Sequence, residues 1–69
     1  MLNYNIWYIN IEDGAPKMRR GYLLNQEDET SYNIRDIISG EYLTVKGDMM
    51  WNTMPEALNK CQELENVKF

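Results

Sequence analysis

The sequence predicts an α+β domain with a single antiparallel sheet of about four strands, arranged as two hairpins. Short runs that alternate apolar and polar residues are separated by Gly-containing turns, which is typical of antiparallel strands. Near the C-terminus, apolar residues recur at helical spacing behind a capping signal. The 69 residues suffice for one small domain, so we treat residues 1–69 as a single unit.

The first predicted strand is NYNIWYINIE, residues 3–12. Both of its faces are apolar at their centres, with Trp7, Ile9 and Ile11 on one and Tyr4, Ile6 and Tyr8 on the other. Asp13-Gly14 and Pro16 are turn formers, so a second strand within MRRGYLLN, residues 18–25, is expected to return antiparallel. Gly21 inside that strand indicates a bulge.

The middle of the chain has two interpretations. NQEDETS, residues 25–31, is a polar loop or the opening of a helix, with Thr30 or Ser31 as the N-cap. Ile34, Ile37 and Ile38 then follow at i, i+3 and i+4, which predicts a short helix ending at Ser39-Gly40. The rival is a strand through these β-branched residues that turns at Ser39-Gly40, and we favour the helix.

A second hairpin is predicted from EYLTVKGDMMW, residues 41–51, where Gly47-Asp48 supplies a two-residue turn before a short return strand. The clearest element is the last. Thr53 and Glu56 form a capping box with Pro55 in the first turn. Behind them a single apolar stripe contains Met54, Ala57, Leu58, Cys61 and Leu64.

This amphipathic helix is expected to pack on one face of the sheet, over Trp7, Ile9 and Ile11. The face with Tyr4, Ile6 and Tyr8 is then left with only the short middle helix to cover it. A chain of 69 residues is near the lower size limit for independent folding, and burying that face against a second copy adds stability. We therefore expect a homo-oligomer, a dimer or larger.

Charge and composition exclude several classes of protein. The net charge is -4, which argues against direct nucleic-acid binding and favours a basic partner. The single cysteine, Cys61, permits no internal disulfide. No apolar run approaches the length of a membrane helix, and the first residues, MLNYN, lack a signal-peptide pattern. We expect a cytoplasmic protein that does not contact membranes.

Catalytic and metal-binding patterns are missing from the sequence. It contains no histidine, and its acids lie in polar stretches where nothing would raise a pKa. Cys61 has no histidine partner and lies on the apolar stripe, so it is interpreted as a buried thiol. We expect no enzyme, no cofactor and no metal site.

One basic cluster, Lys17, Arg19 and Arg20, follows the first turn. The structural interpretation is an edge strand kept soluble by charge. The functional one is an anion site, because arginine grips phosphate through paired hydrogen bonds and Tyr22 beside Tyr8 would offer a stacking surface. This supports an alternative function, in which a homo-oligomer sequesters a small anionic ligand such as a nucleotide.

The acidic counterpart is the run Glu27, Asp28 and Glu29. It is either a solvated loop or a negative surface that complements a basic groove. Tyrosine is enriched where proteins meet, so four tyrosines are candidate anchors beside it: Tyr4, Tyr8, Tyr32 and Tyr42.

In style the chain resembles short accessory proteins encoded by bacteriophages. It is very small, acidic and rich in Asn, Ile and Tyr, and it ends in a helix that starts TMPEAL. The resemblance implies a protein that binds and blocks a host component, such as a defence enzyme. We therefore expect a stoichiometric inhibitor that docks its acidic, aromatic surface on a basic surface of a larger host protein, one that binds nucleic acid or nucleotide.

Overall fold

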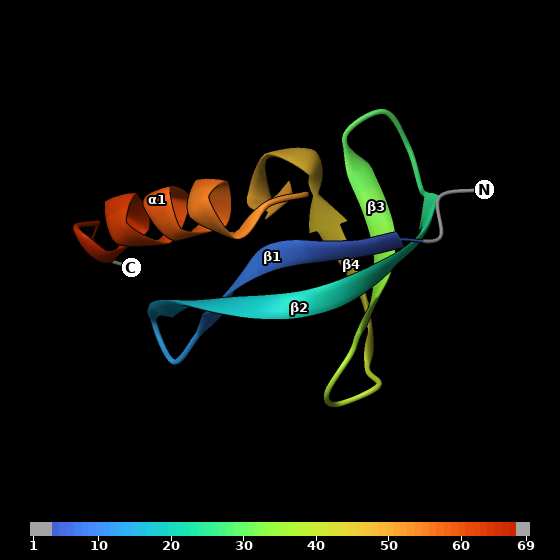
Figure 1. The fold of residues 1–69 in the computed structure, drawn as a ribbon, viewed down its shortest axis with the longest axis horizontal. Coiled ribbons are helices and arrows are strands. Elements are labelled where there is room, and N and C mark those ends of the chain that lie inside the picture. The colour runs from blue at the N-terminus through green and yellow to red at the C-terminus, as the bar shows by residue number, and fades with distance from the viewer. Residues whose placement is uncertain (1–3, 68–69) are drawn as a thin grey trace.

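The computed structural model describes residues 4–67 and confirms the α+β class with one antiparallel sheet (Figure 1). Within this range the elements are β1 (Tyr4–Glu12), β2 (Ala15–Gln26), β3 (Ser31–Asp36), β4 (Tyr42–Lys46), the 3-10 helix η1 (Gly47–Met49), β5 (Met50–Trp51) and α1 (Met54–Glu65). The strand order is β4-β3-β2-β1-β5. The described residues therefore form five strands and one α-helix, and the expected four strands with a middle helix are wrong in detail.

The first hairpin is confirmed. Asp13 and Gly14 form its two-residue turn, with φ angles of 54° and 76°, between the paired residues Glu12 and Ala15. Two positive φ angles match the twist of the flanking strands, which explains the Asp-Gly sequence. Strand β2 starts earlier than expected, and Pro16 lies within it opposite Ile11.

Residues 31–36 form strand β3, so the predicted middle helix is wrong. Its rival is confirmed as far as Asp36, whereas Ile37 and Ile38 lie in the turn after the strand. Ile34 is fully buried while Arg35 is exposed, the alternation expected of a strand. Backbone pairing on both sides fixes the register, with Ile34 opposite Leu23 of β2 and Leu43 of β4. The helical spacing of the isoleucines is overridden because a central strand satisfies its hydrogen bonds on two sides.

The second hairpin is also wrong. Gly47 and Asp48 do not form a tight turn but belong to η1, and the return strand does not pair with β4. Instead Met50 and Trp51 pair with Tyr8 and Trp7 of β1, on the far edge of the sheet.

This connection shows that the sheet is strongly curved. Strands β4 and β5 are its two edges, which in a flat sheet would lie four strand spacings apart, about 19 Å. The chain from Lys46 to Met50 spans at most about 14 Å even when extended. The sheet must therefore curl, and Figure 1 shows β3 and β4 crossing the long β1–β2 hairpin at a steep angle.

The concave face of the sheet holds the main core. It is filled by five buried side chains: Ile6, Tyr8, Leu23, Ile34 and Val45. The face predicted to be left for a partner is thus covered within the chain, apart from Tyr4, which is 42% exposed. Curvature explains the difference, because a curled sheet supplies its own second layer.

Gly21 lies on this concave face and marks no bulge, since it pairs regularly with Ile6 and Asp36. The register shift occurs further along, between Leu23 and Asn25. A Cβ at Gly21 would lie 3.1 Å from Cδ1 of Tyr8, so glycine lets the core side chains pack against the backbone of β2.

The C-terminal helix is confirmed and packs on the other face, against β1, β2 and β5. Thr53 is the N-cap residue, but its hydroxyl bonds the carboxylate of Glu56 at 2.8 Å instead of a backbone amide. Ala57 and Cys61 are buried, as is Ile9 on the covered face, while Ile11 is 38% exposed. In the described part of the chain, no helix has the length and apolarity needed to cross a membrane.

Candidate functional site

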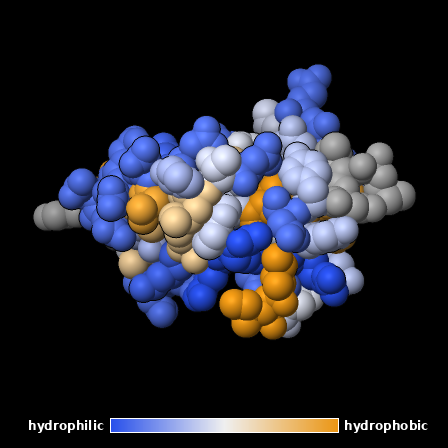
Figure 2. Space-filling view, in the orientation of Figure 1, coloured by the Kyte–Doolittle hydropathy of each residue, from blue (hydrophilic) through white to orange (hydrophobic). Residues whose placement is uncertain are grey.

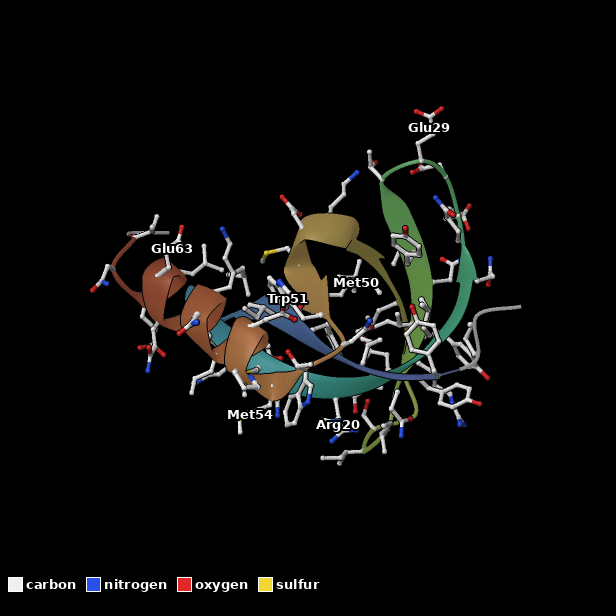
Figure 3. All side chains as sticks on the ribbon, turned by 45° about the horizontal axis from the view of Figure 1, so that its top comes forward. Arg20, Glu29, Met50, Trp51, Met54 and Glu63 are labelled. Atoms are coloured by element: carbon white, nitrogen blue, oxygen red, sulfur yellow. The ribbon has the colours of Figure 1, made fainter. Side chains whose placement is uncertain are left out.

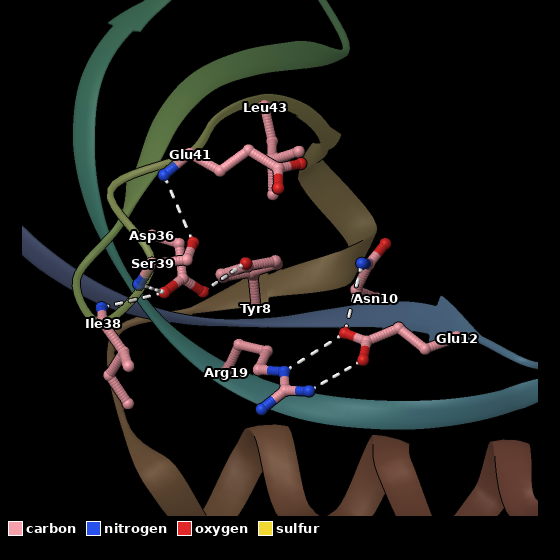
Figure 4. Close-up of a pocket in the computed structure, with 9 residues that line it drawn as sticks. All are labelled: Tyr8, Asn10, Glu12, Arg19, Asp36, Ile38, Ser39, Glu41 and Leu43. Carbon is pink, nitrogen blue, oxygen red and sulfur yellow. Dashed lines mark hydrogen bonds and ion pairs between the residues drawn. The ribbon is translucent and has the colours of Figure 1, made fainter.

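A pocket of about 320 Å³ opens where the concave face meets the turn between β3 and β4 (Figure 4). We call it the concave pocket. Its volume lies at the small end of the range for ligand sites. The lining comes from the β1–β2 hairpin and from β3, β4 and the turn between them. It consists of Tyr8, Asn10, Glu12, Arg19, Asp36, Ile38, Ser39, Glu41 and Leu43.

The pocket floor is a buried hydrogen bond. The Tyr8 hydroxyl donates to Oδ2 of Asp36 at 2.6 Å, and both residues are buried. Burial and the adjacent Asp36 raise the pKa of Tyr8, while the bonds from Tyr8 and from the Ser39 amide lower the pKa of Asp36. Neither group changes protonation near neutral pH, so the pair is a fixed structural contact and not a proton relay.

Asp36 also organises the turn that forms the pocket rim. Its Oδ1 accepts hydrogen bonds from the amides of Ile38 at 2.8 Å and Ser39 at 2.9 Å, a local bonding pattern typical of aspartate in turns. The Gly40 amide donates to the Asp36 carbonyl, and Gly40 adopts a φ of 76°. The Asp36 amide donates to the Glu41 carbonyl. The turn is therefore pinned from both sides.

This pinned turn presents Ile38 to solvent with 85% of its surface exposed. Ile37 beside it is 47% exposed, and its amide bonds the Arg20 carbonyl at 3.1 Å. Figure 2 shows an apolar projection at the position that the β3–β4 turn occupies in Figure 1. Large apolar side chains that a fixed turn exposes to water are typical of interaction sites.

The opposite wall of the pocket is an ion pair. The Arg19 guanidinium donates to both carboxylate oxygens of Glu12, at 2.7 and 3.1 Å, and lowers the pKa of Glu12. Asn10 donates to the same carboxylate. Three carboxylates thus line the pocket with one guanidinium, and no hydrogen bond or ion pair of Glu41's carboxylate occurs within residues 4–67. The excess of negative charge favours a cationic partner.

The predicted acidic run lies elsewhere, in the loop between β2 and β3 at the opposite end of β3 from the pocket (Figures 1 and 3). Asp28 accepts bonds from the amides of Thr30 and Ser31, which lower its pKa and close the loop. Glu27 accepts a bond from Asn33. In the part of the chain that the structure describes, only Glu29 of the three lacks a partner for its side chain, and Figure 3 shows it at the loop tip.

The four candidate tyrosines do not form one surface. Tyr8 is 2% exposed and belongs to the core, so it is not available to a partner. Tyr32 is partly buried and packs against the same core. Tyr4 and Tyr42 are exposed, but they lie on opposite faces of the sheet, since Tyr4 pairs with the buried Leu23 and Tyr42 with the exposed Arg35.

The predicted anion cluster is divided by strand alternation. Arg19 lies on the concave face and is bonded to Glu12, whereas Arg20 lies on the convex face, with its guanidinium 4.6 Å from the centre of the Trp7 ring. Lys17 is exposed opposite Asn10. Tyr22 pairs with Asn5 and Arg35, not with Tyr8. Lys17, Arg19, Arg20 and Tyr22 therefore make no common site.

Cys61 is a buried thiol, as the sequence predicts. Desolvation and the nearby Glu65 raise its pKa, so it stays protonated at neutral pH. Among residues 4–67, no group of three potential ligand side chains is arranged to hold a metal ion.

The sequence did not indicate that Ile38 would be exposed at the pocket, or that Asp36 would be buried and close the turn rather than add to an acidic surface. A local signal exists in the segment DIISG, residues 36–40, because Asp followed by Ser-Gly is typical of a turn that aspartate closes on its own backbone. The helical spacing of the isoleucines predicted a helix over the same residues, so this turn signal was not used. The contact between Tyr8 and Asp36 joins residues 28 positions apart and has no local signal.

Together these features define a small α+β domain in which a curved five-stranded sheet carries a helix outside and a pocket at its rim. In comparisons with known proteins, no family model matches this sequence, and no match was found among the curated proteins or the solved structures.

Proposed function

We propose that this chain is a non-catalytic binding protein, a stoichiometric inhibitor that docks the rim of its concave pocket on a basic surface of a larger host protein. The observation that carries the proposal is Ile38, 85% exposed on a turn pinned through Asp36. The backbone of this turn is already held in place and loses little conformational freedom on binding, so Ile38 is an effective anchor.

The charge of the rim supports a basic partner. Glu12 and Glu41 line the same pocket as the anchor, and Arg19 is the only guanidinium in that lining. A lysine or arginine of the partner would meet a carboxylate next to an apolar anchor, the usual arrangement of a specific interface. Glu29, at the far loop tip, would steer the encounter without sharing this contact.

Substitutions on exposed positions test the docking surface. A tagged chain and its variants are used to capture partner protein from a host lysate, and the affinity for the captured partner is then measured. We expect Ile38→Ser to weaken binding at least about tenfold, since loss of an interface anchor costs about 2 kcal/mol or more. Glu41→Lys should also weaken it and reduce its salt dependence.

The matched control is Leu58→Ser, which removes an apolar side chain that is 40% exposed on α1, away from the pocket. It should bind like the unaltered chain. If Leu58→Ser abolishes binding while Ile38→Ser leaves it unchanged, the docking surface lies on the helix and the proposal is wrong.

Inhibition is tested separately from binding. The proposed target surface is basic and binds nucleic acid or nucleotide, so added polyanion should compete with this chain for the captured partner. Simultaneous binding of the chain and saturating nucleic acid, with no loss of the partner's activity, would contradict inhibition while leaving the docking surface intact.

A further inference from the structure

A second groove of about 320 Å³ lies across strands β2, β3 and β4 and shares only Leu43 with the lining of the concave pocket. We call it the outer groove. Its polar lining lies on the convex face, because Asn25 pairs with Asn33 and Asn33 with Thr44, all opposite in direction to the buried Ile34. Ile34 and Leu43, which also line it, have the concave register. The lining consists of Leu24, Asn25, Asn33, Ile34, Tyr42, Leu43 and Thr44.

The convex face has a charge unlike that of the whole chain. Arg20, Arg35 and Lys46 share the register of this face, as their pairing with Trp7, Tyr22 and Ser31 shows. The carboxylate of Glu27 is close by, but it is bonded to Asn33. Most of the negative charge lies in the concave pocket, in the β2–β3 loop and on α1, which shares the convex face but packs against β1, β2 and β5. The part of the convex face around the groove therefore suits an anion.

The groove also offers an aromatic wall and amide groups. Tyr42 is 70% exposed, and Leu24 comes from the strand on the other side of β3. Two strand spacings, about 10 Å, separate β2 from β4 and leave room for a flat ring above Asn33. The amide of Asn33 is held by Thr44 and Glu27, which fixes its orientation.

Arg35 stands at the rim of the outer groove. It is directly opposite Tyr42 and shares a strand face with Asn33. It is exposed, and within residues 4–67 its guanidinium makes no hydrogen bond or ion pair. Arg20, by comparison, is stacked on Trp7. Arg35 is thus the arginine of this face that can bind an incoming anion through paired hydrogen bonds.

We propose that the outer groove binds a free nucleotide, with the base against Tyr42 and the phosphate on Arg35. Stacking on tyrosine suits any base, and the neighbouring amides can bond its edge. A single available guanidinium at the rim fits one phosphate group. A strand with many phosphates would be repelled by the chain's net charge of -4. The site is distinct from the concave pocket and does not depend on the inhibitor function.

The experiment is an NMR titration of the intact chain with adenosine monophosphate and cytidine monophosphate. Saturable shifts should be confined to the backbone amides of the outer groove, residues 24–25, 33–35 and 42–44. Arg35→Gln should weaken binding of both nucleotides by about tenfold or more, the usual effect of losing a charged hydrogen bond, and leave binding of the free nucleosides unchanged. Tyr42→Ala should weaken nucleotides and nucleosides alike.

The matched control is Arg20→Gln, which removes a guanidinium from the same face but not from the groove rim, and it should bind like the unaltered chain. Three results would overturn the proposal. These are no saturable shift at millimolar nucleotide, equal shifts with inorganic phosphate alone, or a short single-stranded oligonucleotide that binds more tightly than the mononucleotides. None of these results bears on docking at Ile38.

Discussion

At the scale of single residues, Asp36 connects the core of this protein to its candidate site. One carboxylate oxygen accepts the bond of buried Tyr8, and the other closes the turn below Ile38. A carboxylate that is buried must be satisfied by hydrogen bonds, and here the same bonds position the exposed anchor. The stability of the core and the shape of the pocket rim therefore depend on one side chain.

Tyr8→Phe is expected to lower the free energy of unfolding by about 1–3 kcal/mol, because it leaves the charged Asp36 with one bond fewer in a buried place. Urea denaturation monitored by tryptophan fluorescence measures it. A variant as stable as the unaltered chain would contradict the buried bond.

The pH dependence of stability tests the same pair. The pKa of Asp36 is lower in the folded chain than in the unfolded one, so its stabilisation is complete above about pH 4 and is lost as pH falls through the folded value. The pKa of Tyr8 is raised, so its contribution holds below about pH 10 and is lost as pH rises further.

Tyr8→Phe should reduce both the acid and the alkaline loss of stability. Some alkaline dependence should remain, since the pKa of Cys61 is also raised. Some acid dependence should remain in this variant, since Glu12 and Asp28 also have lowered pKa values. Thermal melting from pH 3 to pH 11 measures the loss of stability at acid pH and at alkaline pH. Identical pH profiles for the two proteins would count against the Tyr8–Asp36 contact.

At the scale of elements, the parts with local signals were predictable. The Asp13-Gly14 turn and the C-terminal helix after Thr53 depend on residues close in sequence, and both are present in the structure. Strand β3 and the pairing of β5 with β1 depend on contacts between distant residues, which periodicity does not report. The isoleucine spacing at 34, 37 and 38 matches a helix although only Ile34 is buried.

The candidate site was less predictable than the fold for the same reason. Glu12, Arg19 and Asp36 come from three strands, and only the curvature of the sheet brings them to one pocket. The acidic run at residues 27–29 was predicted to be a docking surface because it is a block of charge. In the structure, Asp28 accepts a bond from the Thr30 amide of its own loop and Glu27 accepts one from Asn33 of β3.

Close packing of β2 against the core gives a prediction for Gly21. Gly21→Ala should destabilise the fold by about 1–3 kcal/mol, because the new methyl group would lie 3.1–3.2 Å from Tyr8, Ile6 and Ile34. Ile34→Val removes the Cδ1 atom that Gly21→Ala would crowd. The double variant should therefore lose less unfolding free energy than the sum of the losses in the two single variants, as measured by urea denaturation. Strict additivity would show that the sheet does not pack in this way.

At the scale of the whole molecule, curvature allows a short chain to enclose its own core. Ile6 and Tyr8 are covered by strands of the same chain, which removes the structural reason for the self-association expected from the sequence. Charge is also separated, with carboxylates at the pocket rim and arginines on the convex face. The two proposed sites follow from this separation.

We therefore expect the chain to remain folded as a monomer at low concentration. Light scattering combined with circular dichroism on dilution measures this. A dimer whose helix and strand signals are lost on dissociation would show that a second copy completes the fold, as expected from the sequence; Met54 and Leu58 of α1 would then be the first residues to substitute.

The central claim is that the pinned turn is the surface that meets the partner. Site-specific photo-crosslinking tests it most directly, with the reactive group placed at position 38, 29 or 58 in separate samples of chain and partner. The account predicts an efficient crosslink from position 38 and none from position 29, which only steers the encounter, or from position 58. A crosslink from position 58 alone would contradict it, because α1 and not the β3–β4 turn would then carry the contact.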